Sequence, residues 1–463
     1  MMKAKKTDFS QGSVYRNILE VAIPMTAAQV ISLLYNIVDR MYIGRIPGEG
    51  RIALTGLGIC FPIIMMINAF ANLFGTGGAP ICAMEQGKGD NEEAERVMGN
   101  TFTLLITTGI LLMILGMIFN RPLLYAFGAS DTTYSYARDY GLIYLAGTVF
   151  VMISLGMNGF INNQGFARTG MMTVLVGAVL NIILDPVFIF IFDMGVRGAA
   201  IATVISQLVS ALWVLRFLTG RNTVLRLKPS VMRLKLNRVK NITVLGLTGF
   251  MMQFTNSVVQ IVCNSTLQTY GGDLYVGVMT VMSSIREIFN MPAMGLTNGA
   301  QPVMSYNYGA GQYDRVKKAI KFTSITGVVL FTVLWGIVAA FPEFFVHIFN
   351  SDPEMIETCV PVMHIYFFGL FMMSLQFCGQ SIFVALGKAK YAIFFSIFRK
   401  IVIVVPLTIL LPGLWDLGTN GVFAAEPVSN FVGGAACFIT MLCVVMPELN
   451  GKKKSCRIRN EKV

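Results

Sequence analysis

Apolar residues are gathered in long runs along the whole chain, and short polar segments separate one run from the next. A helix needs about 20 mainly apolar residues to cross the hydrocarbon core of a bilayer. Twelve runs reach that length and several exceed it, which predicts tilted or kinked helices. The runs lie near residues 15–43, 52–82, 97–119, 134–160, 169–192, 196–218, 240–269, 275–304, 316–341, 357–386, 391–412 and 420–446.

Composition supports a membrane protein and excludes several other classes. Of the 463 residues, 55% are hydrophobic and 13% are charged, and the mean hydropathy is +0.66. Soluble globular chains contain roughly 45–50% apolar and about 25% charged residues. So little polar surface cannot cover a water-soluble body of this size, which excludes a soluble enzyme, a nucleic-acid-binding protein and a disordered chain. We therefore predict an all-α integral membrane protein surrounded by the lipid bilayer.

The net charge of +12 predicts an orientation rather than a nucleic-acid partner, because the basic residues lie between the apolar runs. If both termini are cytoplasmic, a stretch with eight Lys and Arg residues and no Asp or Glu, between 216 and 240, lies inside. The segment 342–357 then lies outside, and it carries four carboxylates and no Lys or Arg. Cytoplasmic loops carry an excess of Lys and Arg. We expect a multi-pass protein of a bacterial cytoplasmic membrane with both termini in the cytoplasm.

The two halves of the chain resemble one another. GGAPICAMEQGKGD (77–90) aligns with GAQPVMSYNYGAGQ (299–312) at a shift of 222 residues, and the same shift pairs GFAR (165–168) with GKAK (387–390). At a shift of 223, GVRGAAIAT (195–203) aligns with GTNGVFAAE (418–426). We predict two pseudo-symmetric six-helix bundles, at residues 1–218 and 240–446, joined by a basic cytoplasmic linker (219–239) and followed by a basic cytoplasmic tail (447–463).

Internal duplication in a polytopic membrane protein is typical of secondary transporters, in which two bundles expose a site alternately to each side. The chain contains no Walker sequence and no glycine-rich dinucleotide fingerprint. Its eight cysteines form no metal-binding spacing, and His347 and His364 lie apart from any acidic or cysteine cluster. We therefore expect no cofactor and no metal centre, with an ion gradient as the energy source. One charge crossing 100 mV releases roughly 2.3 kcal/mol.

Acidic residues within the predicted spans are candidates for ion coupling, because each costs about 2.5–3.5 kcal/mol at a helix centre. They are Asp39, Asp185, Glu287 and Glu426. Tyr35 and Asn36 precede Asp39 by about one helical turn, and Asn181 precedes Asp185 in the same way. These oxygens can share a proton or hold Na⁺, so we predict the coupling site here. Asp39 and Asp185 can instead cap helices or pair with a nearby arginine, such as Arg40.

The repeat assigns this coupling site to the first half. At the shift of 222 residues, aliphatic side chains stand where the first half has its polar ones: Ile261 for Asp39, Ile403 for Asn181 and Leu407 for Asp185. Charged residues in the spans of the second half form either a structural network or part of a substrate cleft. These residues are Arg286, Glu287, Arg399, Lys400 and Glu426.

Several motifs follow one another along the chain: YNIVDRMYIGR, then GGAP and QGKGD, then NQGFARTGMM, NIILDPVFIF and GVRGAAIATVISQ. Together they resemble the multidrug and toxic compound extrusion (MATE) family, most closely its MepA-like bacterial branch. The resemblance covers the whole chain and is most specific in the first half. It implies twelve helices in two lobes around a central cleft, and export of varied, mostly cationic lipophilic drugs driven by inward H⁺ or Na⁺.

The resemblance also implies site residues. The family's first-helix carboxylate and tyrosine fall on Asp39 and Tyr35, its fifth-helix asparagine and aspartate on Asn181 and Asp185, and a sixth-helix hydroxyl on Thr203. Carboxylates that some members carry in the second lobe have no matching position in this chain, and Glu287 is the nearest candidate.

We therefore predict a monomeric multidrug efflux antiporter, not an enzyme, that exports organic cations in exchange for H⁺ or Na⁺ by alternating access. An alternative is a lipid-linked oligosaccharide flippase of related build. Arg286, Arg399 and Lys400 favour that alternative, whereas the carboxylates in the spans oppose it. An intramembrane enzyme would need a nucleophile–base pair or a metal-binding spacing within the spans, and the sequence contains neither.

Overall fold

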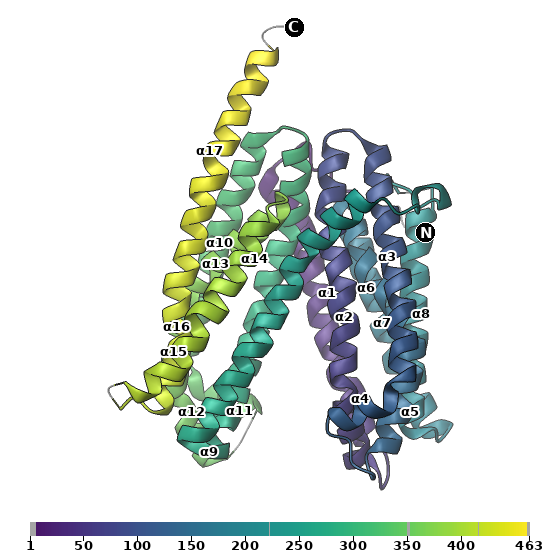
Figure 1. Cartoon of the computed structure of the whole chain (residues 1–463), viewed down its shortest axis with the longest axis vertical. Coiled ribbons are helices and arrows are strands. Elements are labelled where there is room, and N and C mark those ends of the chain that lie inside the picture. The colour runs from purple at the N-terminus through teal and green to yellow at the C-terminus, as the bar shows by residue number, and fades with distance from the viewer. Residues whose placement is uncertain (1–5, 222, 350–351, 415, 461–463) are drawn as a thin grey trace. The chain divides into compact units, whose positions relative to one another are not determined.

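The computed structural model describes residues 6–221, 223–349, 352–414 and 416–460, and these residues form helices with no β-strand among them (Figure 1). The prediction of an all-α chain is confirmed. The helices fall into two compact units. The first unit comprises Met1–Phe9 and Ile23–Gly246, and the second comprises Ser10–Ala22 and Leu247–Val463.

The first unit owes its close helix packing to glycine. A Cβ atom at Gly75 on α2 would lie 2.8 Å from the carbonyl oxygen of Gly156 on α6. Small residues let backbones approach closely where lipid supplies no hydrophobic driving force between helices. The helices in this part of the chain are α1 (Val14–Gly44), α2 (Gly50–Gly87), α3 (Asn91–Ile118), α4 (Asn120–Ala126), α5 (Tyr134–Ala146), α6 (Thr148–Asn163), α7 (Ala167–Pro186), η1 (Val187–Ile191), α8 (Gly195–Thr219) and η2 (Pro229–Val231).

The second unit has an aromatic core. The ring of Phe289 meets that of Phe367 edge-on at 5.9 Å, and the ring of Tyr366 meets that of Phe423 at 6.2 Å. The helices in this part of the chain are α9 (Leu236–Gly309), α10 (Tyr313–Ala340), α11 (Pro342–Phe349), α12 (Pro353–Tyr366), α13 (Leu370–Ala385), α14 (Ala389–Ile397), η3 (Phe398–Val404), α15 (Val405–Leu410), η4 (Leu411–Gly413), α16 (Thr419–Ser429), η5 (Asn430–Gly434) and α17 (Ala435–Asn460).

The predicted spans correspond to straight, broken and bent helices. Within the described residues, nine helices are long and apolar enough to cross a membrane. One of them, α9, has 74 residues, too many for one crossing, and it breaks at Gly272, where φ is 66° and ψ is −162°. It therefore supplies two of the predicted spans, 240–269 and 275–304.

Two bent helix pairs supply the remaining spans. Helices α5 and α6 meet at 55° beside Gly147, and α12 and α13 meet at 54° beside Gly369, whose φ is 66°. Gly147 and Gly369 are 222 residues apart, which is the shift at which the two halves of the sequence align. The bend is therefore repeated at equivalent positions of the two halves.

The first turns of α1 and α9 belong to a different unit from the rest of each helix. In the second unit, a Cβ atom at Gly299 would lie 2.5 Å from the Cα atom of Ala22. In the first unit, Gly246 lies so close to the backbone carbonyl of Leu73 that a Cβ atom has no room. This division differs from the predicted domains, which kept residues 1–218 and 240–446 whole. The predicted tail (447–463) is helical as far as it is described, because α17 continues to Asn460.

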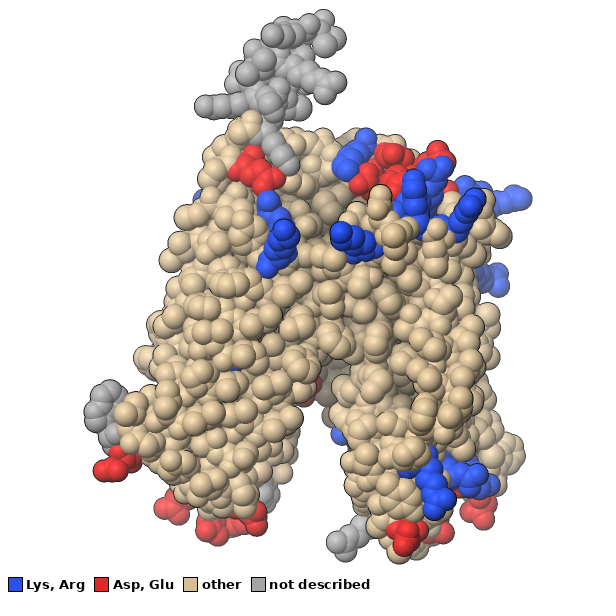
Figure 2. All heavy atoms as spheres, viewed as in Figure 1, with Lys and Arg blue, Asp and Glu red and all other residues tan. Residues whose placement is uncertain are grey.

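Charged side chains of each unit gather at its ends, and the surface between them is apolar (Figure 2). Exposed Leu111 and Ile114 on α3, and Val329 and Val333 on α10, belong to this apolar surface. At one end of the second unit the exposed charges are acidic and come from the segment 342–357. The distribution matches what a bilayer requires of a protein that crosses it.

Candidate functional site

Helix α7 carries two of the predicted residues, Asn181 and Asp185, one turn apart on the same face. Both are buried, with exposed fractions of 3% and 0%. The Asn181 side-chain amide donates a hydrogen bond of 3.1 Å to Oδ1 of Asp185. Pro186 follows directly and has no backbone N–H, and the chain continues in the wider π-helical turn η1. The carboxylate thus lies where regular α-helical hydrogen bonding is interrupted.

The carboxylate of Asp39, on α1, lies within hydrogen-bond reach of Asp185. Oδ1 of Asp39, Oδ2 of Asp185 and the amide oxygen of Asn181 are buried and have no hydrogen-bond partner among the described residues. Two carboxylates at this separation repel one another unless a proton or a cation is shared between them. The structure therefore brings together three oxygens that can accept either.

Two hydroxyl groups complete the cluster. Thr203, on α8, lies 3.4 Å from the side-chain amide of Asn181. Tyr140, on α5, is 3% exposed and lies within hydrogen-bond reach of Thr203 and close to Asp39. The sequence analysis did not identify Tyr140. Its signal was the pair Tyr140 and Tyr144, one turn apart inside an apolar run, whose rings stack at 6.0 Å.

The remaining predicted residues of the first half lie at the margin of this cluster. Tyr35 is half-buried beside Asp39, whereas Asn36 is exposed and donates a hydrogen bond of 2.6 Å to the backbone oxygen of Ser32. The guanidinium of Arg40 lies over the ring of Phe61 at 5.5 Å and makes no ion pair with Asp39 within the described residues. Asp39 and Asp185 also lie inside helices rather than at helix caps. The structure thus supports neither alternative role for the two aspartates.

We call Asp39, Tyr140, Asn181, Asp185 and Thr203 the carboxylate cluster. It combines two carboxylates with an amide oxygen and two hydroxyls, drawn from α1, α5, α7 and α8 of one unit. Such hard oxygen donors bind protons or small hard cations. The arrangement can hold one H⁺ or Na⁺ as a transported or coupling ion.

The second unit contains a separate group of buried charges. Oε1 of Glu426, on α16, lies 3.1 Å from Nζ of Lys400, 3.4 Å from Nη2 of Arg399 and 3.6 Å from Nη1 of Arg286. Arg399 also donates to the side chain of Asn430. We call these five residues the cationic cluster. The structure thus brings the predicted Arg286 and Glu426 together, whereas Glu287 is exposed on α9.

Two helical units of repeated design, each with charged groups buried at membrane depth, define the class of secondary transporters. The family model MatE matches residues 24–187 and 250–410, once in each half. The chain belongs to the MatE family.

Relatives and solved structures agree with this assignment. The chain is 24% identical over 409 residues to the multidrug export protein MepA of Staphylococcus haemolyticus, covering 88% of this chain and 89% of that protein. It is 22% identical to MepA of Staphylococcus aureus, covering 88% and 90%. A MATE structure in the bent conformation superposes with a TM-score of 0.89 at 24% identity, covering 97% of this chain and 99% of that one. An outward-facing multidrug resistance MATE transporter superposes with a TM-score of 0.88 at 23% identity, with the same coverage.

These comparisons confirm four predictions: the family, the MATE-like fold, the multi-pass membrane protein, and a transporter rather than an enzyme. At such identities the solved structures establish the fold alone. The roles of the carboxylate cluster and of the cationic cluster stay predictions.

Proposed function

We propose that this chain exports cationic lipophilic compounds in exchange for H⁺ or Na⁺ by alternating access. Family membership and the names of the MepA relatives support multidrug export. The observation that carries the coupling proposal is the contact between the carboxylates of Asp39 and Asp185, with oxygens that lack partners. No cofactor enters this proposal, because the ion gradient supplies the energy.

Ion binding changes the packing of the first unit in this mechanism. With the cluster empty of protons and cations, Asp39 and Asp185 repel one another and favour separation of α1 from α7. An H⁺ or Na⁺ between them removes the repulsion and draws α1 towards α7 and α8. By linkage, an ion that favours one conformation lowers the affinity for a drug that favours the other by the same factor. An ion entering down its gradient thereby drives drug release on the outside.

We place the protein in a bacterial cytoplasmic membrane with both termini in the cytoplasm. The eight basic residues between 216 and 240 and the acidic segment 342–357 support this orientation. Its partners are then the lipid bilayer and organic cations, and a monomer suffices because the carboxylate cluster is drawn from one chain.

The test is ethidium efflux from proteoliposomes on which a pH gradient and a Na⁺ gradient are imposed separately. Asp39→Asn and Asp185→Asn each remove one charge and should abolish gradient-driven efflux. Asp139→Asn is the matched control, since Asp139 forms an exposed ion pair of 2.9 Å with Arg197 and should support normal efflux. Normal efflux by both cluster variants would refute the coupling role. The gradient that drives the wild type identifies the ion.

The flippase alternative keeps one supporting observation, the cationic cluster, because buried Arg and Lys side chains suit a pyrophosphate. The same proteoliposomes decide between the two functions when they contain a fluorescent polyprenyl pyrophosphate lipid. A flippase moves that lipid between leaflets without an ion gradient, whereas an antiporter leaves it in place and moves ethidium.

A further inference from the structure

The cationic cluster has more positive than negative charge. Arg286, Arg399 and Lys400 all contact one carboxylate, Glu426, which leaves a formal excess of two positive charges. Arg399, Lys400 and Glu426 are 5%, 6% and 5% exposed. Glu287, the acid adjacent to Arg286 in the chain, is exposed and lies outside the cluster. A second carboxylate does not appear in any ion pair of this cluster within the described residues.

A purely structural ion pair does not account for this excess. One cation would neutralise Glu426, and each further buried charge costs free energy unless something pairs with it. Asn430 satisfies part of Arg399 through a neutral amide, which carries no countercharge. The cluster therefore lacks an anion that the described residues do not supply.

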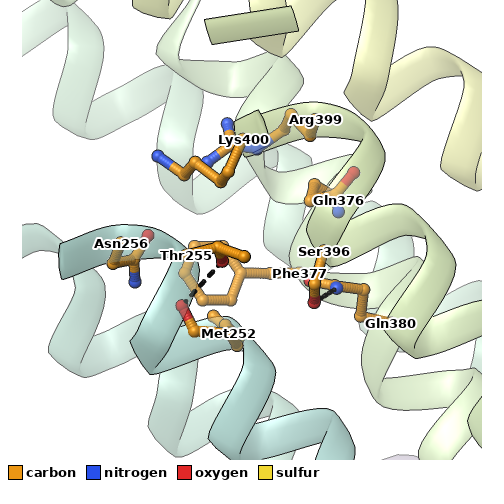
Figure 3. A pocket seen from close by; sticks show the side chains of 9 residues that line it. All are labelled: Met252, Thr255, Asn256, Gln376, Phe377, Gln380, Ser396, Arg399 and Lys400. Carbon is orange, nitrogen blue, oxygen red and sulfur yellow. Dashed lines mark hydrogen bonds between the residues drawn. The ribbon is translucent and has the colours of Figure 1, made fainter. Parts of the chain in front are cut away.

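Two of the three cations line a pocket. Arg399 and Lys400, on the π-helical turn η3, lie at one side of it, and residues of α9 and α13 form the rest of its wall (Figure 3). Its empty volume is about 300 Å³, including the part that is open to solvent. Glu426 does not line it. The cations therefore face the pocket and their carboxylate partner does not.

The pocket wall also holds an unsatisfied polar group. Gln376, on α13, is 4% exposed, and its side-chain oxygen has no hydrogen-bond partner within the described residues. Its amide nitrogen is used in a bond of 3.3 Å to the backbone oxygen of Phe395. Buried polar atoms without partners are rare in native structures and indicate an occupant that would satisfy them. A hydroxyl or N–H group of a ligand would do so.

The repeat makes the reversed polarity specific to this half. Glu426 stands at the position of Thr203, and Ile403 and Leu407 stand at the positions of Asn181 and Asp185. Equivalent helices thus carry carboxylates in one unit and cations in the other. The two clusters attract ions of opposite charge.

We propose that this pocket binds the anionic group of a small amphiphilic molecule, a carboxylate, phosphate or sulfonate, through Arg399 and Lys400. Arginine can hold such a group with two parallel hydrogen bonds, and lysine adds a compact charge. Transport of such compounds rests on the proposed export function, whereas their binding does not. Zwitterionic and acidic compounds then join the cations as ligands of this protein.

Binding is tested with purified full-length protein in detergent, by fluorescence anisotropy of rhodamine B and of rhodamine B ethyl ester. The two dyes share the same rings, but only rhodamine B has a free carboxylate. The wild type should prefer rhodamine B by about tenfold or more, since a hydrogen bond to a charged group contributes about 1.5–3 kcal/mol. Lys400→Gln should remove the preference and Lys400→Arg should keep it. Lys321→Gln, which removes a charge from the exposed start of α10, should leave it unchanged.

Equal affinity for the two dyes, no binding of either, or an unchanged preference in Lys400→Gln would overturn the proposal. Misfolding is distinguished by the ester, which a folded Lys400→Gln variant binds as the wild type does. Displacement of rhodamine B by a polyprenyl phosphate would identify a lipid as the source of the anionic group, and its absence would identify a soluble compound. Because no gradient is present, these results stand apart from failure of ethidium efflux.

Discussion

Glu426→Gln should strongly destabilise the second unit. The substitution keeps the size of the side chain but removes the only carboxylate that contacts three buried cations at 3.1–3.6 Å. At an effective dielectric constant of about 20, each contact has a gross attraction of about 5 kcal/mol. Water and neighbouring dipoles offset most of this, and removing one partner of a buried ion pair typically costs about 3–5 kcal/mol. For a unit of this size, that loss corresponds to a decrease in Tm of roughly 6–20 °C.

The buried cysteines provide the assay. Among the described residues, Cys263, Cys359, Cys378 and Cys437 of the second unit are buried and free, so a maleimide dye reacts with them only when the unit opens. Cys443 is exposed and reacts at all temperatures, so the measurements use a Cys443→Ser background. The temperature at which dye fluorescence rises reports the opening of the second unit in detergent.

Glu287→Gln is the matched control, because Glu287 lies on α9 of the same unit but is exposed. Its Tm should change by about 1 °C or less, since a single exposed charge contributes little. The double variant Glu426→Gln with Lys400→Met should recover part of the loss, because it removes one of the unpaired cations. If Glu426→Gln and Glu287→Gln had the same Tm as the wild type, the charge balance described for this cluster would be incorrect.

Two further predictions concern the first unit. Tyr140→Phe removes only the hydroxyl beside Thr203 and Asp39, so it should lower gradient-driven ethidium efflux severalfold while stability falls by about 0.5–1.5 kcal/mol; unchanged efflux would remove Tyr140 from the carboxylate cluster. Asn100→Ala should speed tryptic cleavage after Arg233 severalfold in inside-out vesicles, because the buried Asn100 side chain binds the backbone of the linker at 2.9–3.3 Å. Asn91→Ala, at the exposed start of α3, is its control, and equal cleavage of the two variants would contradict this anchoring role.

Much of the fold could be predicted because each feature depends on local chemistry. Length and hydropathy alone mark a membrane-spanning helix, so the run near 134–160 predicts a span whether or not it bends at Gly147. The positions of the two bends and the break at Gly272 were not predicted, because an isolated glycine inside an apolar run does not show whether the backbone leaves the helix there. The repeat was legible because glycine turns recur in one register.

The candidate site was predictable only in part. Buried acids are costly, so Asp39 and Asp185 were evident, and Asn181 followed from helical spacing. Tyr140 was not, because tyrosine is unexceptional in an apolar run and only the packing of α5 beside α1 and α8 gives its hydroxyl a role. Asn36 was included by spacing, yet its helix face leaves it exposed. The exchange of the first turns of α1 and α9 between units was likewise invisible in the linear order.

By itself, the sequence determined the class of protein, the number of spans, the duplication and the segregation of carboxylates into one half and cations into the other. These properties follow from which residues lipid tolerates and from repetition along the chain. Only the tertiary structure decided that Asp39 meets Asp185 across two helices, that three cations share Glu426, and that two of them face a pocket. The reason is that such contacts join residues over 20 to 150 positions apart, and helix packing rather than local sequence chooses which faces meet.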